Sequence, residues 1–361
     1  MSESSFHQAR PYSLADYGWD EAWQHAFAPH AAAGLIPARL VRAERGSCEA
    51  ATDSGIIRVE TAGATANGEP CTGDWLAVRP AAEGHPPLLY AVLERRTALV
   101  RSSASRTSRG QILAANVDTV VVTVSLAAPL KHARVERMLA LAWESGARPV
   151  VVLTKADACA DAPQAAAEVA ETAPGVDVLV TSVVTGEGLD ALAAVLDGTI
   201  VLLGPSGAGK SSLGNHLLGE ERLATGSVRE QDGKGRHTTA WRELLPLPGG
   251  GVLLDTPGLR AVGLQDAQDG LEQTFAEIEQ LAGNCRFGDC AHATEPGCAV
   301  VAAIESGEIT QRRLDSYKRL LRENAYAAAR AEGRLRAEQK AVRKGITRHQ
   351  RATYQFRERQ Q

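Results

Sequence analysis

One segment of the chain has the residue types and the spacing of a phosphate-binding loop. It follows the apolar run Thr199–Leu203 and consists of Gly204, Pro205, Ser206, Gly207, Ala208, Gly209, Lys210, Ser211 and Ser212. Its glycines let backbone N–H groups point at phosphate oxygens, Lys210 brings a catalytic cation to the β and γ phosphates, and Ser211 offers Mg²⁺ a hydroxyl. The apolar spacing from Lys210 to Leu218 predicts a helix whose positive end adds to phosphate binding. A chance glycine-rich turn would lack this context, so the segment predicts a nucleoside triphosphate site.

Residues further along the chain can supply the other magnesium and γ-phosphate contacts. Asp255 ends the apolar run Val252–Leu254, which places its carboxylate at a strand end where it can hold Mg²⁺ through water. The backbone N–H of Gly258 can then reach the γ phosphate. Asp-Thr-Pro-Gly alone is more often a turn, but its position after a phosphate loop favours the nucleotide. In the polar stretch Gly226–Thr239 between them, Thr238 or Thr239 can supply a second magnesium hydroxyl, and Thr239 is preferred.

Two segments before the phosphate loop have the chemistry to recognise guanine. In the first, Thr154-Lys155-Ala156-Asp157, the carboxylate of Asp157 can accept hydrogen bonds from the two N–H groups on guanine's edge, which adenine cannot provide. Lys155 would lie along the base and sugar. In the second segment, Ser182 and the backbone of Val183 would close the site near the guanine O6. A lone Lys-x-Asp after a valine-rich strand could instead begin a surface helix.

The order of these segments is unusual for a GTPase. An ordinary GTPase domain begins with the phosphate loop, continues with Asp-x-x-Gly and ends with the base-recognition segments. Here the base-recognition segments at 154–157 and 181–183 come first, and the phosphate loop and Asp255 follow. The order predicts a circularly permuted GTPase.

The residue that activates the attacking water is not where many GTPases place it. They have a glutamine after the glycine of Asp-x-x-Gly, and this chain has Leu259, whose apolar side chain cannot orient water. His237 is the predicted catalytic replacement, because an imidazole can orient or deprotonate water near neutral pH. The alternatives are a solvent-exposed loop histidine and a group contributed by a partner.

Three cysteines and a histidine after the GTPase region have metal-ligand spacing. They form the pattern Cys285-x4-Cys290-x-His292-x5-Cys298. Thiolates and imidazole suit tetrahedral Zn²⁺, and four protein ligands leave no open position, so one structural zinc is predicted. Disulfides are the alternative; a histidine inside the cluster and the expected intracellular location favour zinc. Cys48, Cys71 and Cys159 are scattered and predicted to be apolar fillers.

Charge is segregated along the chain, which implies a partner of opposite charge. Residues 311–361 hold fifteen Lys or Arg and five Asp or Glu, whereas the whole chain has a net charge of −4. The basic arm from Arg312 to Arg359 contains Tyr317, Tyr326, Tyr354 and Phe356, a mixture suited to phosphate contacts and base stacking in RNA. The alternative is a solvated helix that packs on the acidic GTPase domain. The sequence has neither an apolar run long enough to span a bilayer nor a signal-peptide pattern at its start, so a cytosolic location is predicted.

The pattern of strand-like and helix-like runs around these residues predicts several domains. Short runs with strand character suggest a small barrel of the OB type, namely Ala38–Ala43, Ile56–Thr61, Trp75–Val78, Leu88–Leu93 and Ala98–Arg101. Alternating strands and helices then predict a doubly wound α/β domain with ligands at the carboxyl ends of its strands. We expect an N-terminal extension at 1–35, an OB-fold RNA-binding barrel at 36–100, a permuted P-loop GTPase domain at 111–262, a mostly helical zinc-binding domain at 263–330 and a basic tail at 331–361.

The permuted motif order, the run from Gly110 to Asp118 and the zinc cluster ending in Glu295-Pro296-Gly297-Cys298 together resemble the RsgA (YjeQ) family of GTPases over about residues 36–330. The resemblance implies an OB barrel, a GTPase domain and a zinc domain in this order. It also implies a GTPase that binds the 30S ribosomal subunit and 16S rRNA, is stimulated by that subunit, and acts late in its maturation. Thr154 departs from the family's commoner asparagine, and the tail is longer than the resemblance covers.

Two other classes of function stay open at this stage. In a nucleotide-gated RNA-binding module, binding would do the work and hydrolysis would be incidental. A metabolic P-loop kinase would need an acceptor site, and Asp157 with Ser182 argues against it. One large partner favours a monomer.

Overall fold

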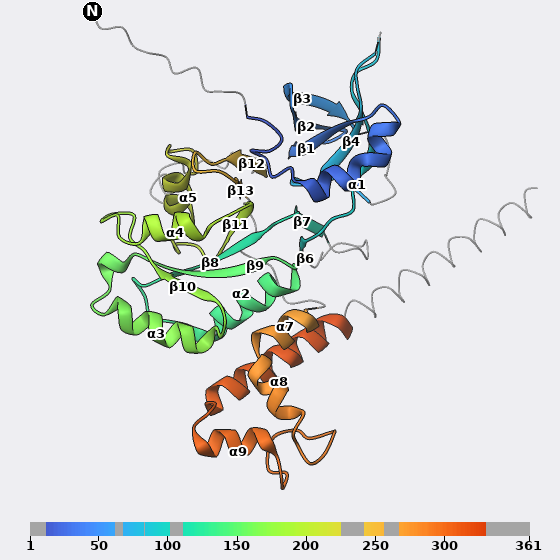
Figure 1. Cartoon of the computed structure of the whole chain (residues 1–361). Helices are drawn as coiled ribbons and strands as arrows, with labels where there is room; N and C mark the ends of the chain where they lie inside the picture. Colours follow the sequence, from blue (N-terminus) through green and yellow to red (C-terminus); the bar gives the residue numbers. More distant parts are fainter. Residues whose placement is uncertain are drawn as a thin grey trace, which may run out of the picture. The chain divides into compact units, whose positions relative to one another are not determined.

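The computed structural model describes residues 12–61, 68–82, 84–101, 111–224, 242–255 and 267–329. The chain divides into two compact units. The first unit comprises residues 1–100 and 112–262, and the second comprises residues 101–111 and 263–361. The first contains a barrel and an α/β sheet, and the second is helical (Figure 1).

The barrel is built from five strands in the closed order β1-β2-β3-β5-β4. They are β1 (Ile36–Ala43), β2 (Ser47–Thr52), β3 (Gly55–Glu60), β4 (Trp75–Arg79) and β5 (Leu88–Val92). Small and branched side chains fill the narrow interior, namely Ala38, Leu40, Cys48, Ala50, Val59, Leu76, Val78, Leu89 and Val92. The barrel that the sequence predicts is therefore confirmed.

One predicted barrel strand is wrong. Ala98–Arg101 forms β6, which pairs outside the barrel with β7 (Gln111–Ala115) in a two-stranded sheet. Its place in the barrel is taken by β2, which pairs with both β1 and β3. The sequence of β2 is Ser-Cys-Glu-Ala-Ala-Thr, and its serine, glutamate and alanines are not typical strand formers. Tertiary pairing on both sides, rather than local propensity, makes this segment a strand.

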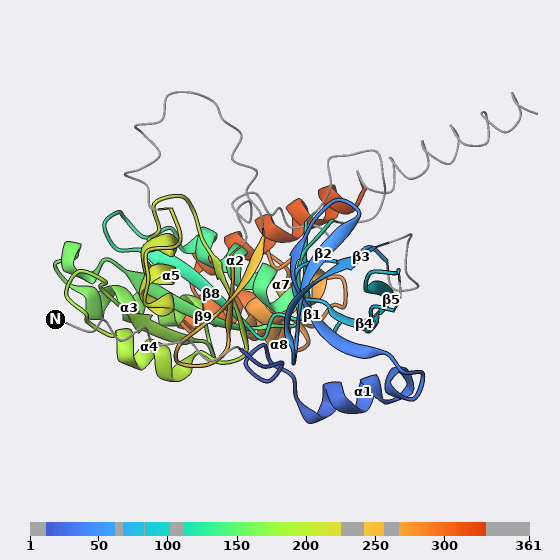
Figure 2. The same cartoon turned by 90° about the horizontal axis from the view of Figure 1, so that it is seen from above.

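Helix α1 (Glu21–Ala32) covers the outside of the barrel (Figure 2). Asp20 caps it by accepting a 2.7 Å hydrogen bond from the N–H of Trp23. Trp23 packs on Trp75 of β4 with ring centroids 5.9 Å apart, and Phe27 is buried one turn later. Residues 20–32 of the predicted N-terminal extension thus pack on the barrel.

The α/β part contains a six-stranded sheet in the order β10-β9-β8-β11-β13-β12. Its strands are β8 (Thr119–Ser125), β9 (Arg148–Thr154), β10 (Asp177–Val180), β11 (Thr199–Leu203), β12 (Glu243–Pro246) and β13 (Val252–Asp255). All pair in parallel except β12, which is antiparallel to β13. Helices α2 (His132–Glu144) and α3 (Ala162–Thr172) cover one face, and α4 (Leu189–Val195) and α5 (Lys210–Leu218) cover the other (Figure 1). The predicted doubly wound fold is confirmed.

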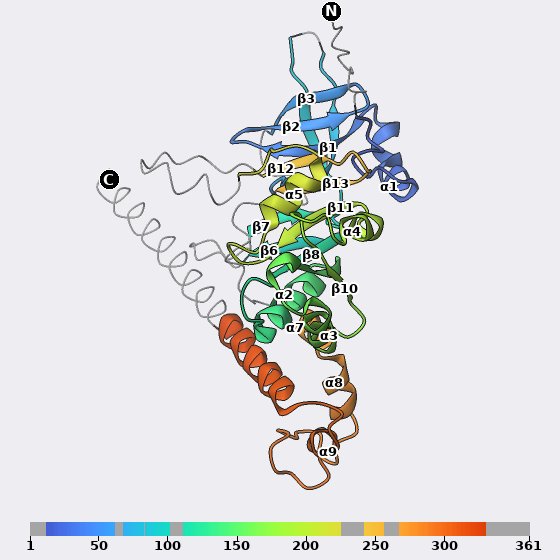
Figure 3. The same ribbon diagram turned by 90° about the vertical axis from the view of Figure 1, so that its left-hand side faces the viewer.

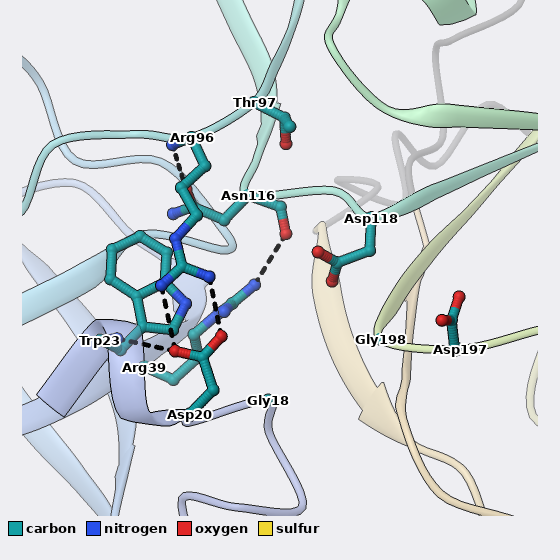
Figure 4. Close-up of a pocket in the computed structure, with 10 residues that line it drawn as sticks. All are labelled: Gly18, Asp20, Trp23, Arg39, Arg96, Thr97, Asn116, Asp118, Asp197 and Gly198. Carbon is teal, nitrogen blue, oxygen red and sulfur yellow. Dashed lines mark hydrogen bonds and ion pairs between the residues drawn. The ribbon is translucent and has the colours of Figure 1, made fainter.

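A hydrogen-bonded junction joins the barrel to the start of this sheet (Figure 4). Asn116 donates through Nδ2 to the carbonyl of Gly73 at 3.0 Å and accepts through Oδ1 from the N–H of Arg96 at 2.9 Å. Its own carbonyl accepts from Arg39 at 3.1 Å, and the same guanidinium donates to the hydroxyl of Thr199 at 2.9 Å. Burial lowers the pKa of Arg39 to about 10. Arg39, Arg96 and Asn116 are among the residues that line a cavity of about 220 Å³.

Replacing the central asparagine is expected to destabilise the first unit. Asn116 has a φ of 53°, in the left-handed region. Asn116→Ala should lower the free energy of unfolding by about 2–4 kcal/mol, because the buried carbonyl of Gly73 and the N–H of Arg96 lose their partner and a left-handed alanine is strained. Urea denaturation measures this. Asn116→Gly separates the causes, since glycine removes the hydrogen bonds without the strain. A loss below about 0.5 kcal/mol in Asn116→Ala would contradict the assigned role.

The second unit is helical (Figure 3). It contains α7 (Gln268–Thr274), α8 (Ala276–Ala282), α9 (Ala299–Ser306) and a helical segment over 311–329. Phe275 is fully buried, with the ring of Tyr317 at 5.2 Å and the guanidinium of Arg313 at 4.2 Å. Arg313 also pairs with Glu277 at 2.7 Å.

Two members of the predicted basic RNA-binding arm are buried in the second unit. Arg313 and Tyr317 hold the second unit together and do not face a partner, because both are buried. Tyr326 is 65% exposed. The tail at 331–361 lies outside the described residues.

Candidate functional site

All the described nucleotide motifs follow the carboxyl ends of strands. Thr154 ends β9, Thr181 follows β10, Gly204 follows β11 and Asp255 ends β13. Because these strands belong to one parallel set, their carboxyl ends share an edge of the sheet. The base-recognition segments are also tied together, since the N–H of Ala156 donates to the carbonyl of Thr181 at 3.1 Å. The fold thus gathers motifs that are far apart in sequence.

The phosphate loop has the backbone that its glycines require. Gly207 and Gly209 have φ values of 79° and 84°, and Gly209 is the N-cap of α5. Lys210, Ser211 and Ser212 therefore form the first turn of that helix, whose free N–H groups and positive dipole end favour an anion. The ammonium of Lys210 donates to the carbonyls of Gly204 and Pro205, at 2.8 and 2.7 Å.

A residue that sequence reasoning missed explains why position 204 is glycine. A side chain there would meet Thr123, because a Cβ on Gly204 would lie 2.2 Å from the Oγ1 of Thr123. That hydroxyl donates to the carbonyl of Leu203 at 3.1 Å. Thr123 thus fixes the exit of β11 into the phosphate loop. Nothing in the sequence distinguishes Thr123 from other threonines of a buried strand.

The predicted guanine-binding residues come together at the end of β10. The hydroxyl of Ser182 donates to Oδ1 of Asp157 at 2.5 Å and accepts from the N–H groups of Val184 and Thr185, both at 3.2 Å. Ser182 is fully buried whereas Asp157 is exposed. The serine therefore holds one carboxylate oxygen and leaves the carboxylate facing solvent. Lys155, two residues before Asp157, has a φ of 60°. Val183, which follows Ser182, is 40% exposed.

Thr154 connects the base-recognition segment to the phosphate loop. Its hydroxyl donates to the carbonyl of Ala208 at 2.7 Å, and both residues are buried. A Cβ on Gly209 would lie 3.3 Å from the same hydroxyl, so only a glycine fits there without adjustment. The single hydrogen bond that threonine can donate is thus used inside the protein, to fix two parts of the site relative to each other.

Several predicted site residues lie outside the described residues. They are His237, Thr239 with its alternative Thr238, and Gly258. Asp255, by contrast, is described at the end of β13 and is paired in register with Glu243 of β12.

The zinc ligands predicted from the sequence lie in one cluster. The ligand atoms of Cys285, Cys290, His292 and Cys298 are all within 4.8 Å of one another. Tetrahedral zinc with normal bond lengths places two sulfurs about 3.8 Å apart and a sulfur and a nitrogen about 3.5 Å apart. The Sγ atoms of Cys285 and Cys298 are 3.8 Å apart, and Nδ1 of His292 is 3.6 and 3.5 Å from them. The cluster therefore fits one zinc ion, and all its cysteines are free thiols rather than disulfides.

Neighbouring groups shape the loop that carries these ligands. Glu295 accepts hydrogen bonds from the N–H groups of Ala291, Ala293 and Thr294, and they hold the pKa of its carboxyl at about 2. Burial, and then the charge of Lys318, lower the pKa of His292, which favours the neutral imidazole that a metal needs. His292 has a φ of 53°.

Among the residues that the structure describes, no helix combines the length and apolar character needed to cross a lipid bilayer.

Known proteins resemble both the sequence and the fold. The family model described as RsgA GTPase matches residues 92–265. The chain is 56% identical over 346 residues to the small ribosomal subunit biogenesis GTPase RsgA of Streptomyces coelicolor, covering 94% of this chain and 93% of the relative. It is 42% identical over 357 residues to the RsgA of Opitutus terrae, covering 94% and 97%. The crystal structure of YjeQ from Thermotoga maritima is similar with a TM-score of 0.61 and 26% identity, over 80% of this chain and 98% of that one. The structure of YloQ, described as a circularly permuted GTPase, gives a TM-score of 0.58 at 26% identity, over 80% and 94%.

Proposed function

The chain belongs to the RsgA GTPase family and is a GTP hydrolase of small-ribosomal-subunit biogenesis, and we propose that it acts late in maturation, with hydrolysis stimulated by the 30S subunit. It cleaves the β–γ phosphoanhydride of GTP. One observation supports guanine as the base: Ser182 holds a carboxylate oxygen of Asp157 at 2.5 Å, at the same sheet edge as the phosphate loop.

The proposed guanine site uses both segments before the phosphate loop. Asp157 accepts from the two N–H groups on the guanine edge while Ser182 holds its carboxylate in place. Lys155 lies along the base and sugar, and the backbone of Val183 closes the site near the guanine O6. Thr154 is a positioning residue, because its hydrogen bond to the carbonyl of Ala208 sets the distance between the base and phosphate subsites.

The proposed phosphate site combines the loop at 204–212 with the ends of β11 and β13. Backbone N–H groups of the loop hold the phosphates, and Lys210 exchanges its carbonyl partners for β and γ phosphate oxygens. Ser211, Thr239 and Asp255 offer the oxygen ligands that Mg²⁺ prefers. The magnesium ion, when bound with GTP, neutralises charge between the β and γ phosphates. Gly258 contributes its N–H to the γ phosphate.

The attacking water requires a group other than Leu259, because a leucine cannot accept its proton. We assign this role to His237, whose imidazole can orient the water or take its proton near neutral pH. If His237→Ala hydrolyses GTP as fast as the parent in the presence of 30S subunits, the assignment is wrong.

The proposed partner is the small subunit, with 16S rRNA as the surface contacted. The barrel and the excess of Lys and Arg in the tail at 331–361 support a contact with RNA phosphates. We further propose a cytoplasmic monomer that does not bind a membrane. The alternative function, a nucleotide-gated RNA-binding module, differs in needing no turnover.

Steady-state hydrolysis separates these functions. GTP turnover would be measured with the protein alone, with 30S subunits, with 50S subunits and with unrelated RNA, using ATP as the control nucleotide. Strong stimulation by 30S alone is the expected result. Equal slow rates in every mixture would favour the binding module, and preference for ATP would overturn the guanine assignment.

Asp157→Asn is expected to change which base is bound. The amide replaces one acceptor with a donor, so it matches the carbonyl that xanthine has in place of guanine's amino group. GTP affinity should fall by about 10–100-fold, since a buried polar contact is lost, and XTP should become the better substrate. Equilibrium binding of both nucleotides measures the exchange. Asp161→Asn, on a carboxylate that caps α3, is the matched control and should keep the preference for GTP.

A further inference from the structure

An aromatic side chain stands exposed on the outside of the barrel. Tyr90 of β5 is 55% exposed, whereas its neighbours Leu89 and Val92 are buried in the barrel interior. Strict alternation along a strand would not place buried residues three positions apart. The barrel therefore departs from regular pairing at this tyrosine.

A β-bulge causes the departure. On β4, Ala77 and Val78 are adjacent, but their partners on β5 are Ala91 and Leu89. Tyr90 is the extra residue between those partners. Bulges turn a side chain away from the regular pattern and occur often beside functional sites. Here the extra residue carries a large aromatic ring out of the barrel.

Two other side chains frame the ring. The guanidinium of Arg79, an exposed residue of β4, lies 5.9 Å from the ring centroid of Tyr90. The ring of His30, near the end of α1, meets it edge to face at 6.3 Å. His30 packs in turn on the buried Phe27 at 5.6 Å. The tyrosine is thus supported at one side by the helix and keeps more than half of its surface open.

We propose that Tyr90, Arg79 and His30 form a stacking platform for an unpaired nucleobase of RNA. Base–aromatic stacking needs an open ring, and an adjacent guanidinium supplies cation–π or phosphate contacts. The platform rests on the proposed function in one respect, that the RNA belongs to the small subunit.

The closed barrel argues against a peptide strand as the occupant. A peptide that adds to a sheet needs a free strand edge, and the five strands of this barrel are paired in a ring. The cation beside the ring suits a base and its phosphate better than an apolar side chain. A protein face that contacts the tyrosine by side chains alone stays as an outcome of the test.

Affinity for a single-stranded probe tests the platform directly. The full-length protein would be titrated into a fluorescein-labelled oligoadenylate and into a labelled RNA duplex of the same length, with fluorescence anisotropy as the readout. Tyr90→Ala should weaken binding to the single strand about tenfold and leave duplex binding unchanged. Tyr90→Phe should keep the affinity, because the ring is retained. Ile56→Ala, which truncates an exposed residue of β3 in the same barrel, is the matched control.

Measurements with 30S subunits separate this inference from the proposed function. If 30S stimulates the parent and Tyr90→Ala alike and oligoadenylate binding is also unchanged, the platform is wrong and the function stands. If 30S stimulates no variant, the function fails, and the oligoadenylate titration still decides the platform. If Tyr90→Ala weakens 30S binding but not oligoadenylate binding, the occupant is a protein, which overturns the RNA proposal. Basal GTP hydrolysis should be the same in every variant.

Discussion

Lys210→Ala is expected to lower kcat/KM for GTP hydrolysis by about 10²–10³-fold or more, because the charge that develops on the γ phosphate loses a positioned cation. The ammonium lies in the first turn of α5 and contacts the carbonyls of Gly204 and Pro205 at 2.8 and 2.7 Å. It therefore also braces the loop before nucleotide binds. Steady-state kinetics with saturating 30S subunits measure the loss.

A second lysine provides the control for that experiment. Lys131 is exposed at the start of α2, and its side chain makes no cap hydrogen bond. Lys131→Ala removes the same charge from the same unit and should keep the parent's rate. Thermal unfolding of Lys210→Ala shows whether the loop alone is affected. A rate for Lys210→Ala within a few-fold of the parent would contradict the assigned phosphate contact.

Cys298→Ala is expected to release zinc and melt the second unit. Cys298 is a ligand of the cluster and also caps α9, where its Sγ accepts from the N–H of Val301 at 3.4 Å. Structural zinc contributes on the order of 10–16 kcal/mol of binding free energy at neutral pH, which is comparable to the whole free energy of unfolding of a typical domain, about 5–15 kcal/mol. Zinc content after dialysis should fall from one ion per chain to almost none, and calorimetry should lose the transition of the second unit.

A cysteine outside the cluster provides the control for this prediction. Cys159→Ala changes a thiol of the first unit that lies outside the cluster, so zinc content and both transitions should stay as in the parent. A chelator added to the parent should reproduce the effect of Cys298→Ala. If a reducing agent melts the second unit and the chelator does not, the cluster is held by disulfides after all.

Local sequence predicts the elements that carry motifs. The strand Thr199–Leu203 and the helix Lys210–Leu218 have in the structure the bounds that the sequence predicts, because an apolar run, a glycine at the N-cap and Gly219 at the C-cap define them. The strand Ser47–Thr52 is missed because its residues have little strand propensity and its pairing with two neighbours decides its conformation. Ala98–Arg101 is a strand as predicted, but pattern alone does not say which sheet it joins.

In the candidate site, too, local features could be predicted from the sequence and long-range contacts could not. Spacing identifies the phosphate loop and the zinc cluster, since all their members lie within a short stretch of chain. The hydrogen bond from Thr154 to Ala208 joins residues 54 positions apart, so only the folded sheet reveals it. Tyr317 illustrates the opposite error. It lies in a basic segment, yet its ring packs on Phe275 and its hydroxyl bonds Glu279, because composition does not tell which side of a helix is buried.

The strand order of the sheet bears on how the protein is made. Strands β8, β9 and β10 form one contiguous half and leave the ribosome first, whereas β11, β12 and β13 form the other half and emerge later. Within the sheet, the two halves are joined by the pairing of β8 with β11. The early half carries the proposed guanine contacts and the late half carries the proposed phosphate contacts, so on this proposal an unfinished chain has no complete nucleotide site. GTP bound in the proposed site would contact both halves, and we therefore expect it to stabilise their pairing increasingly as nucleotide concentration rises.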